Sequence, residues 1–247
     1  GRVGILRRIA PSMPEGANLV AGPRSKSTLT IWQLLPQLFQ SGRGFGTLVI
    51  WLAIGTNLIA NTTVQTWLTE ILLRSGFDQG VAIRATGMAF IAGIVSAFII
   101  GPLMDRFGPY RVTVALFAAA ALFRSALGLS LAFDSATLVL AAAFAAGFCT
   151  SSIQKAQNAL SVYFYPVALR STGLGWGLGV GRSGAIVGPI LFGYLLGSLQ
   201  WSPTAVFCVT AIPLLVGGTA IFLMGRHYGE EPISERSVVT EPQPAKA

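Results

Sequence analysis

Long apolar stretches separated by short polar ones dominate the pattern along the chain. A helix needs about 18 or more apolar residues to cross a bilayer, and six stretches meet that length. They run over residues 45–69, 85–104, 112–133, 136–165, 173–199 and 204–225. The segments between them are too short to form a second soluble domain. The pattern therefore predicts an all-α membrane protein, a bundle of six transmembrane helices.

The two ends of the chain differ in composition from these stretches. Residues 1–44 are rich in Pro, Gly, Ser and basic residues, which is typical of a flexible linker. The polar end of the chain is expected to form a disordered tail. The predicted organisation is a cytoplasmic linker over 1–44, the six-helix bundle over 45–226 and a cytoplasmic tail over 227–247. Because a linker joins two parts, we expect a fragment, the second half of a longer protein.

Composition and charge support a membrane location. The chain is 53% hydrophobic and 11% charged, whereas soluble domains are about a quarter charged. With the N-terminus in the cytoplasm, only Arg74 and Arg84 fall in outer loops, and the other basic residues outside the spans are cytoplasmic. This bias predicts a multi-pass protein of the cell (inner) membrane with both termini cytoplasmic. The basic residues border the lipid bilayer and form no stripe for nucleic acid.

Few residues could support catalysis or metal binding. Cys149 and Cys208 lie inside apolar spans, where a thiol packs as a small hydrophobe, and His227 is the one histidine. No span carries a carboxylate pair or a nucleophile beside a base. We therefore expect no metal, no cofactor and no enzymatic activity.

The stretch GVGRSG, residues 179–184, fits the pattern G-x-G-x-x-G of dinucleotide-binding turns. Such a turn follows a strand and precedes an acid by about 20 residues, but the next acid after Gly184 is Glu230. Small residues also let transmembrane helices approach closely, and Pro189 is expected to kink this helix. The glycines therefore indicate helix packing in a moving wall of a cavity.

Polar side chains inside the spans are candidates for a binding site, because they are costly against lipid and should face the bundle interior or a wet cavity. Two sets recur at a helical spacing. They are Asn57, Asn61 and Gln65 in the first span, and Ser151, Gln154, Lys155, Gln157, Asn158 and Ser161 in the fourth. Hydrogen bonds that only hold the helices together are the alternative interpretation.

Three cations, Arg124, Lys155 and Arg182, lie within spans, and no carboxylate does. Arg182 lies well inside the fifth span, where its guanidinium cannot easily reach water. A buried charge without a partner is destabilising. We expect the missing negative charge to come from a substrate, from an absent half of the protein, or from both. Bridging to helix carbonyls is the alternative for Arg182, and a structural role is the preferred interpretation of Arg124.

The loop after the second span reads GPLMDRFGPYRV, residues 101–112. It resembles the loop motif G-x-x-x-D-R-x-G-x-x-R of the major facilitator superfamily, found on the cytoplasmic side of each six-helix half. The matching residues are Gly101, Asp105, Arg106, Gly108 and Arg111. The resemblance implies the second half of that fold, with these residues in gating. Asp105 would accept hydrogen bonds from helix amides and from an arginine of the neighbouring bundle; a simple charged turn is the alternative.

A narrower resemblance lies in YPVALRSTGLGWGLGVGRSGAIVGPILFGYLL, residues 165–196. It is similar to the aromatic acid:proton symporter family, with the turn Y-P-x-x-x-R-x-T-G followed by G-x-G-R-x-G-A-I-x-G-P. The matching residues are Tyr165, Pro166, Arg170, Thr172, Gly173, Gly181, Arg182, Gly184, Gly188 and Pro189. That family's proton-coupling acid motif lies in its first helix and is absent from this chain. Lys155 also departs from the family pattern.

The resemblance implies a secondary transporter that moves an aromatic carboxylate and protons together by alternating access, with an N-terminal six-helix half as partner. The substrate site is expected to comprise Arg182, Lys155, Gln157, Asn57, Asn61 and Trp67. Arg182 would attract the carboxylate of this small anionic substrate, and the others would supply polar and ring contacts. Two alternatives stay open: a sugar or other organic-acid carrier of the same fold, and a non-transporting membrane sensor or assembly subunit.

Overall fold

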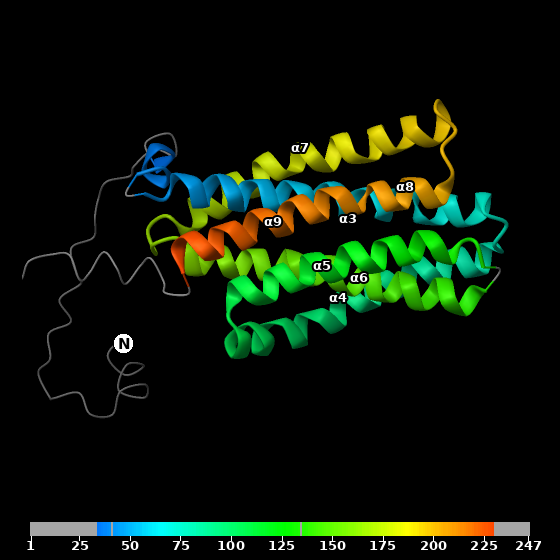
Figure 1. The fold of residues 1–247 in the computed structure, drawn as a ribbon, viewed down its shortest axis with the longest axis horizontal. Helices are drawn as coiled ribbons and strands as arrows, with labels where there is room; N and C mark the ends of the chain where they lie inside the picture. Colours follow the sequence, from blue (N-terminus) through cyan, green and yellow to red (C-terminus); the bar gives the residue numbers. More distant parts are fainter. Residues whose placement is uncertain (1–33, 41, 134, 230–247) are drawn as a thin grey trace, which may run out of the picture. The chain divides into compact units, whose positions relative to one another are not determined.

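The computed structural model describes residues 34–40, 42–133 and 135–229, which form helices and no strands (Figure 1). The elements are η1 (Pro36–Leu38), α3 (Gly44–Arg74), α4 (Gln79–Phe107), α5 (Pro109–Ser130), α6 (Ala136–Phe164), α7 (Arg170–Gly197), α8 (Pro203–Val209) and α9 (Ala211–Tyr228). Over the described residues, six helical segments are long and apolar enough to cross a membrane, and α8 and α9 together form the last of them. The predicted linker and tail lie largely outside the described residues.

The prediction of an all-α bundle with six spans is confirmed, and the helices extend past several predicted boundaries. The second span was expected from residue 85, but α4 begins at Gln79, where the Asp78 carboxylate accepts a hydrogen bond of 2.8 Å from the Gly80 amide. The hydroxyl of Ser202 caps α8 in the same way. Capping side chains are polar, so a search for apolar residues misses the first turn of such a helix.

Helices α3 and α6 form the centre of the bundle. Helix α3 packs against α7 and α9, α6 packs against α4 and α5, and α3 and α6 also touch each other. The two sets of polar residues found in the sequence therefore lie on the two central helices. Helices α4 and α7 flank this centre. In each of them only 22% of the most apolar 18-residue stretch is buried inside the bundle.

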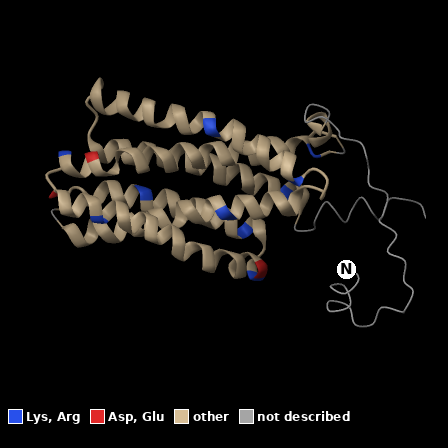
Figure 2. Ribbon diagram, turned by 180° about the vertical axis from the view of Figure 1, so that it is seen from behind, with Lys and Arg blue, Asp and Glu red and all other residues tan. Residues whose placement is uncertain are grey.

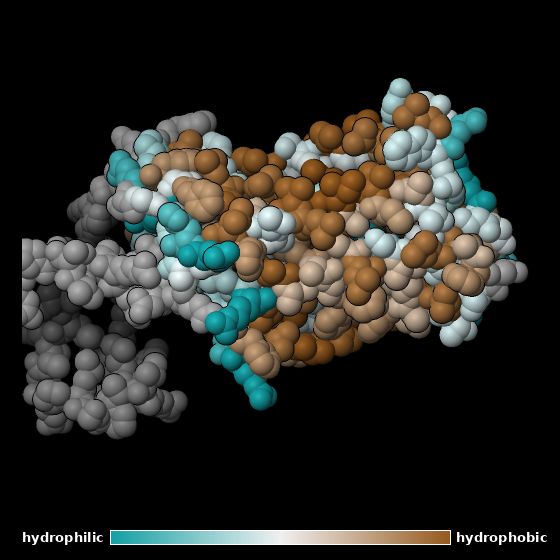
Figure 3. Space-filling view, viewed as in Figure 1, coloured by the Kyte–Doolittle hydropathy of each residue, from teal (hydrophilic) through white to brown (hydrophobic). Residues whose placement is uncertain are grey.

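A broad hydrophobic band covers the face drawn in Figure 3, with hydrophilic residues toward the helix ends. Large apolar side chains are exposed on the two flanking helices, for example Phe98 on α4 and Ile190 on α7. Exposed side chains of this kind are expected where a helix meets lipid or another apolar helix.

The glycines of α7 pack this helix tightly against α3. The stretch 179–184 lies within the helix Arg170–Gly197, which confirms helix packing over a dinucleotide turn. A Cβ added at Gly188 would lie 2.6 Å from the Thr63 hydroxyl oxygen and 3.0 Å from the Ile59 carbonyl oxygen. At Gly179 an added Cβ would meet nothing within 4 Å. Only some of the glycines therefore serve the α3–α7 contact.

Gly188→Ala should lower the free energy of unfolding by about 1–3 kcal/mol, because the added methyl overpacks the α3–α7 contact. Gly179→Ala is the matched control on the open side of α7. It should keep or raise stability, since alanine favours a helix over glycine by about 1 kcal/mol. Thermal unfolding of the purified variants in detergent measures both effects. Equal shifts for the two variants would contradict a close contact at Gly188.

Candidate functional site

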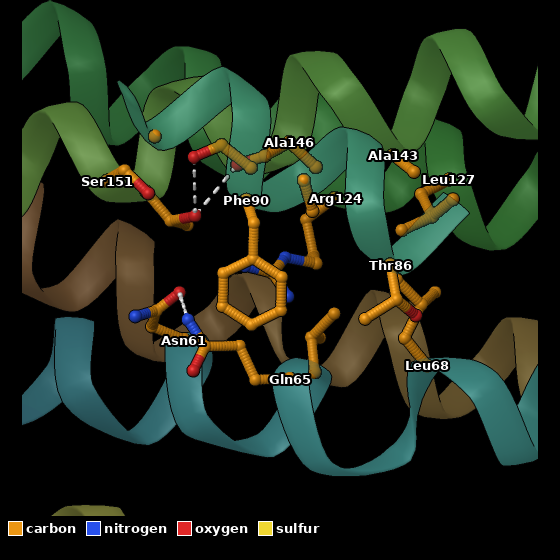
Figure 4. Close-up of a pocket in the computed structure, with 15 residues that line it drawn as sticks. Asn61, Gln65, Leu68, Thr86, Phe90, Arg124, Leu127, Ala143, Ala146 and Ser151 are labelled. Carbon is orange, nitrogen blue, oxygen red and sulfur yellow. Dashed lines mark hydrogen bonds between the residues drawn. The ribbon is translucent and has the colours of Figure 1, made fainter. Parts of the chain in front are cut away.

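A cavity of about 100 Å³ lies between α3, α4, α5 and α6 (Figure 4). Its polar and aromatic lining residues are Asn61 and Gln65 of α3, Thr86 and Phe90 of α4, Arg124 of α5, and Thr150 and Ser151 of α6. An apolar cavity of about 150 Å³ can hold benzene. This pocket therefore has room for a carboxylate and part of an aromatic ring.

Arg124 forms the deepest charged part of this pocket. The residue is 1% exposed and stands in the buried face of α5, four residues after Ala120 and three before Leu127. One nitrogen of its guanidinium donates to the Ala60 carbonyl at 3.4 Å, and its Nε has no hydrogen-bond partner among the described residues. A guanidinium has five N–H donors. Most of the N–H donors of Arg124 therefore have no acceptor among the described residues.

Negative charge is scarce around this arginine. Among the described acids, Glu70 pairs with Arg74 at 2.8 Å, Asp78 caps α4, and Asp105 lies near the other end of α4. Figure 2 shows the acidic residues of the described ranges near helix ends, whereas some basic residues lie part-way along the helices. No ion pair joins Arg124 to an acid within the described ranges.

Lys155 joins α6 to α4 beside the pocket and is not one of the residues that line it. Its ammonium donates to the Gly93 carbonyl at 3.0 Å, the Ser96 hydroxyl at 2.9 Å and the Ser151 carbonyl at 3.2 Å. Gly93 and Ser151 both line the pocket. The three donors of the ammonium thus have protein acceptors, and a direct contact with substrate would have to displace one of them.

The predicted amide residues fall into two groups. Asn61 lines the pocket, where its carbonyl oxygen accepts from Gln65 Nε2 at 3.3 Å (Figure 4). Asn57 and Gln157 are 0% and 1% exposed and do not line it, and their amides have no hydrogen-bond partner among the described residues. Buried polar groups without partners are uncommon in native proteins and call for a ligand, an ion or water.

The remaining predicted site residues lie on the side of α7. The indole N–H of Trp67 donates to the Pro189 carbonyl at 3.1 Å, and the ring packs on Gly193. Arg182 is exposed on α7, and no hydrogen bond or ion pair joins it to another described residue. Of the predicted site residues, Asn61 lines the pocket, Lys155 lies behind its wall, and Arg182 and Trp67 lie away from it.

The predicted gating motif spans the turn between α4 and α5. Gly108 ends α4 and precedes α5 with φ of 86°, a backbone conformation that glycine adopts without steric cost. Arg106 lies over the ring of Phe107 at 5.3 Å. Gly101, Asp105 and Arg111 are exposed around the same turn. The turn geometry explains the glycine at position 108, and a gating role for the motif stays a prediction.

Sequence reasoning assigned Arg124 a structural role and left it out of the site. The signal that could have included it is a lone arginine among small and apolar residues within a span, away from the described acids, which lie near helix ends. Thr86 and Phe90 carried no such signal, because only the packing of α4 on α6 brings them to the pocket.

Comparison with known proteins assigns the family. Residues 44–246 match the family model described as Major Facilitator Superfamily. The chain belongs to the major facilitator superfamily. A gallate transporter of Pseudomonas putida is 37% identical over 189 residues, which cover 76% of this chain and 41% of the transporter. A benzoate transport protein of Acinetobacter baylyi is 35% identical over 199 residues, covering 80% of this chain and 42% of that protein.

A 4-hydroxybenzoate transporter of Acinetobacter baylyi is 31% identical over 220 residues, covering 89% of this chain and 48% of the transporter. This superfamily member therefore spans less than half the length of each of these relatives. The similarity agrees with the resemblance to aromatic acid transporters found in the sequence, and the family assignment favours transport over catalysis.

Proposed function

We propose that the chain is one six-helix half of a secondary transporter that carries an aromatic carboxylate together with a proton by alternating access. The family and the transporters of gallate, benzoate and 4-hydroxybenzoate support this proposal. Each of those three compounds joins an aromatic ring to a carboxylate. The substrate class is therefore argued from the chemistry that these relatives share.

One observation carries the proposal: positive charge inside the spans with no described acid beside it. Arg124, Lys155 and Arg182 lie within α5, α6 and α7, and the described acids lie at helix ends. An uncompensated charge at membrane depth is costly and marks a substrate or ion pathway. An anionic substrate supplies the compensating charge, which a neutral sugar does not.

The complementary partner in this proposal is an N-terminal six-helix half. Superfamily transporters rock two such halves about a substrate site near the bilayer midplane. Helices α4 and α7 expose large apolar side chains that a second half can cover. The excess of basic residues on one side supports cytoplasmic termini in the cell (inner) membrane, and cysteine accessibility at residue 75, in the loop after α3, checks this orientation from outside the cell.

Uptake by cells tests the proposed function. Cells without endogenous transport that express the chain with its complementary half should accumulate labelled benzoate and exclude benzamide, and a protonophore should abolish accumulation. Inhibition by a sugar or an aliphatic acid, with none by aromatic acids, would favour the other carriers of this fold. No flux of any of these compounds would favour the non-transporting subunit.

Asp105→Asn should reduce transport much more than substrate binding in the complete transporter. The proposed role of the motif is to set the balance between inward-open and outward-open states, and a shift in that balance slows the cycle while the site persists. Uptake and equilibrium binding of benzoate measure the two effects separately. An equal loss of both would contradict a gating role for this exposed carboxylate.

Arg182 keeps its proposed role as a contact for the carboxylate on the face of α7. Arg182 is exposed in this half. Once the complementary half covers it in the complete transporter, Arg182→Gln should weaken benzoate binding by about 2–4 kcal/mol, the range for losing one partner of a buried charge pair. Lysine at this position should restore part of the loss, because it keeps the charge without the planar fork. Calorimetry on the folded variants measures this change in binding affinity. Unchanged affinity with lower thermal stability would indicate a structural arginine.

A further inference from the structure

The pocket beside Arg124 is closed at one side and open at the other. Arg124 is 1% exposed, whereas Phe90 of α4, which also lines the pocket, is 58% exposed. Figure 4 shows Phe90, Arg124 and the paired amides of Asn61 and Gln65 around one space. Phe90 therefore lies at the exposed side of the pocket and the guanidinium of Arg124 at its buried side.

The unused hydrogen-bonding capacity of Arg124 points to an anion in this space. Its one recorded hydrogen bond, to the Ala60 carbonyl, is long at 3.4 Å, and N–H···O bonds weaken beyond about 3.2 Å. A carboxylate accepts two parallel hydrogen bonds from a guanidinium, which satisfies the charge and the donors together. Arginine suits such a site because its planar fork matches the two carboxylate oxygens.

Lys155 adds positive charge behind the wall of the same pocket. Two of its acceptors, the carbonyls of Gly93 and Ser151, belong to residues that line the cavity. No described acid faces the cavity, since its lining includes neither Asp nor Glu. The charge around the pocket therefore favours an anion and opposes a cation.

We propose that this pocket binds the carboxylate end of an aromatic acid, with Arg124 as its charge partner and Phe90 beside the ring. The proposal rests on the proposed function, because that function supplies an aromatic acid. The proposed contact at Arg124 lies in a different part of this half from the proposed contact at Arg182. The amides of Asn61 and Gln65 and the hydroxyl of Ser151 offer further hydrogen bonds to the ligand.

Site-directed labelling tests where the carboxylate binds. In the complete transporter with Cys149→Ala and Cys208→Ser, single variants Ser151→Cys, in the pocket, and Ser75→Cys, in the loop after α3, are treated with a small maleimide. Benzoate should slow labelling at position 151 and leave position 75 unchanged. Benzamide, which has the same ring without the charge, should protect neither position.

The charge partner is tested in the Ser151→Cys background. Arg124→Gln should raise the benzoate concentration for half-protection by about 30-fold, the effect of removing one partner of a buried charge pair. Arg124→Lys should fall between the parent and Arg124→Gln, because it keeps the charge without the fork. Thermal unfolding checks that each variant is folded. If Arg124→Gln does not fold, the half-protection concentration of Arg124→Lys alone tests the charge partner.

The outcomes separate this inference from the proposed function. The transporter can bind and take up benzoate while its cysteine at position 151 stays unlabelled, or is labelled equally with and without benzoate. Either result overturns the pocket assignment and leaves the proposed function intact. Unchanged half-protection in both Arg124 variants overturns the charge partner. A complete transporter without any substitution that neither binds nor transports benzoate overturns the proposed function, and the assignment of this ligand with it.

Discussion

The lack of water in the bilayer core is the constraint on which the rest of this structure depends. Backbone groups there must be satisfied within helices, and most side-chain hydroxyls follow the same rule. Thr62, Thr113 and Ser161 each donate to the carbonyl four residues earlier in their own helix. Local hydrogen bonds thereby satisfy the short polar side chains. The longer ones, Asn57, Gln157 and Arg124, are left to find partners between helices.

Close approach of helices decides where space remains inside the bundle. Glycines bring α7 against α3, and Gly147 brings α6 so near α4 that an added Cβ would lie 2.7 Å from Ala89 Cα. Between α3 and the α4–α6 pair the facing residues include Asn61, Gln65 and Phe90, and there the cavity opens. Tight contacts on both sides of this gap hold the walls of the pocket in place. The cavity is therefore a consequence of uneven side-chain size along the helix contacts.

Charge gives that space its chemical character. A cation buried in the bundle costs free energy unless a negative group accompanies it, and the described acids lie at helix ends. Lys155 is stabilised by three protein acceptors, whereas Arg124 has one long hydrogen bond. This difference separates a cation that holds α4 to α6 from one that is available to a ligand. In a superfamily whose members include carriers of aromatic acids, such an arginine is suited to bind a substrate carboxylate.

The sequence by itself determined the class of fold and the family. Six apolar stretches predicted six membrane-spanning helices because hydropathy and length act locally, and the residues at 101–111 and 165–189 indicated the superfamily without knowledge of the packing. The sequence also singled out Asn61 and Lys155, since a polar residue within an apolar span is visible one helix at a time. It placed Arg182 and Lys155 in one substrate site, but which side chains share a cavity depends on how helices far apart in the chain pack. Only the tertiary structure brought Arg124 of α5, Phe90 of α4 and Asn61 of α3 to one pocket, because helix rotation and close approach at glycines such as Gly147 decide which faces meet.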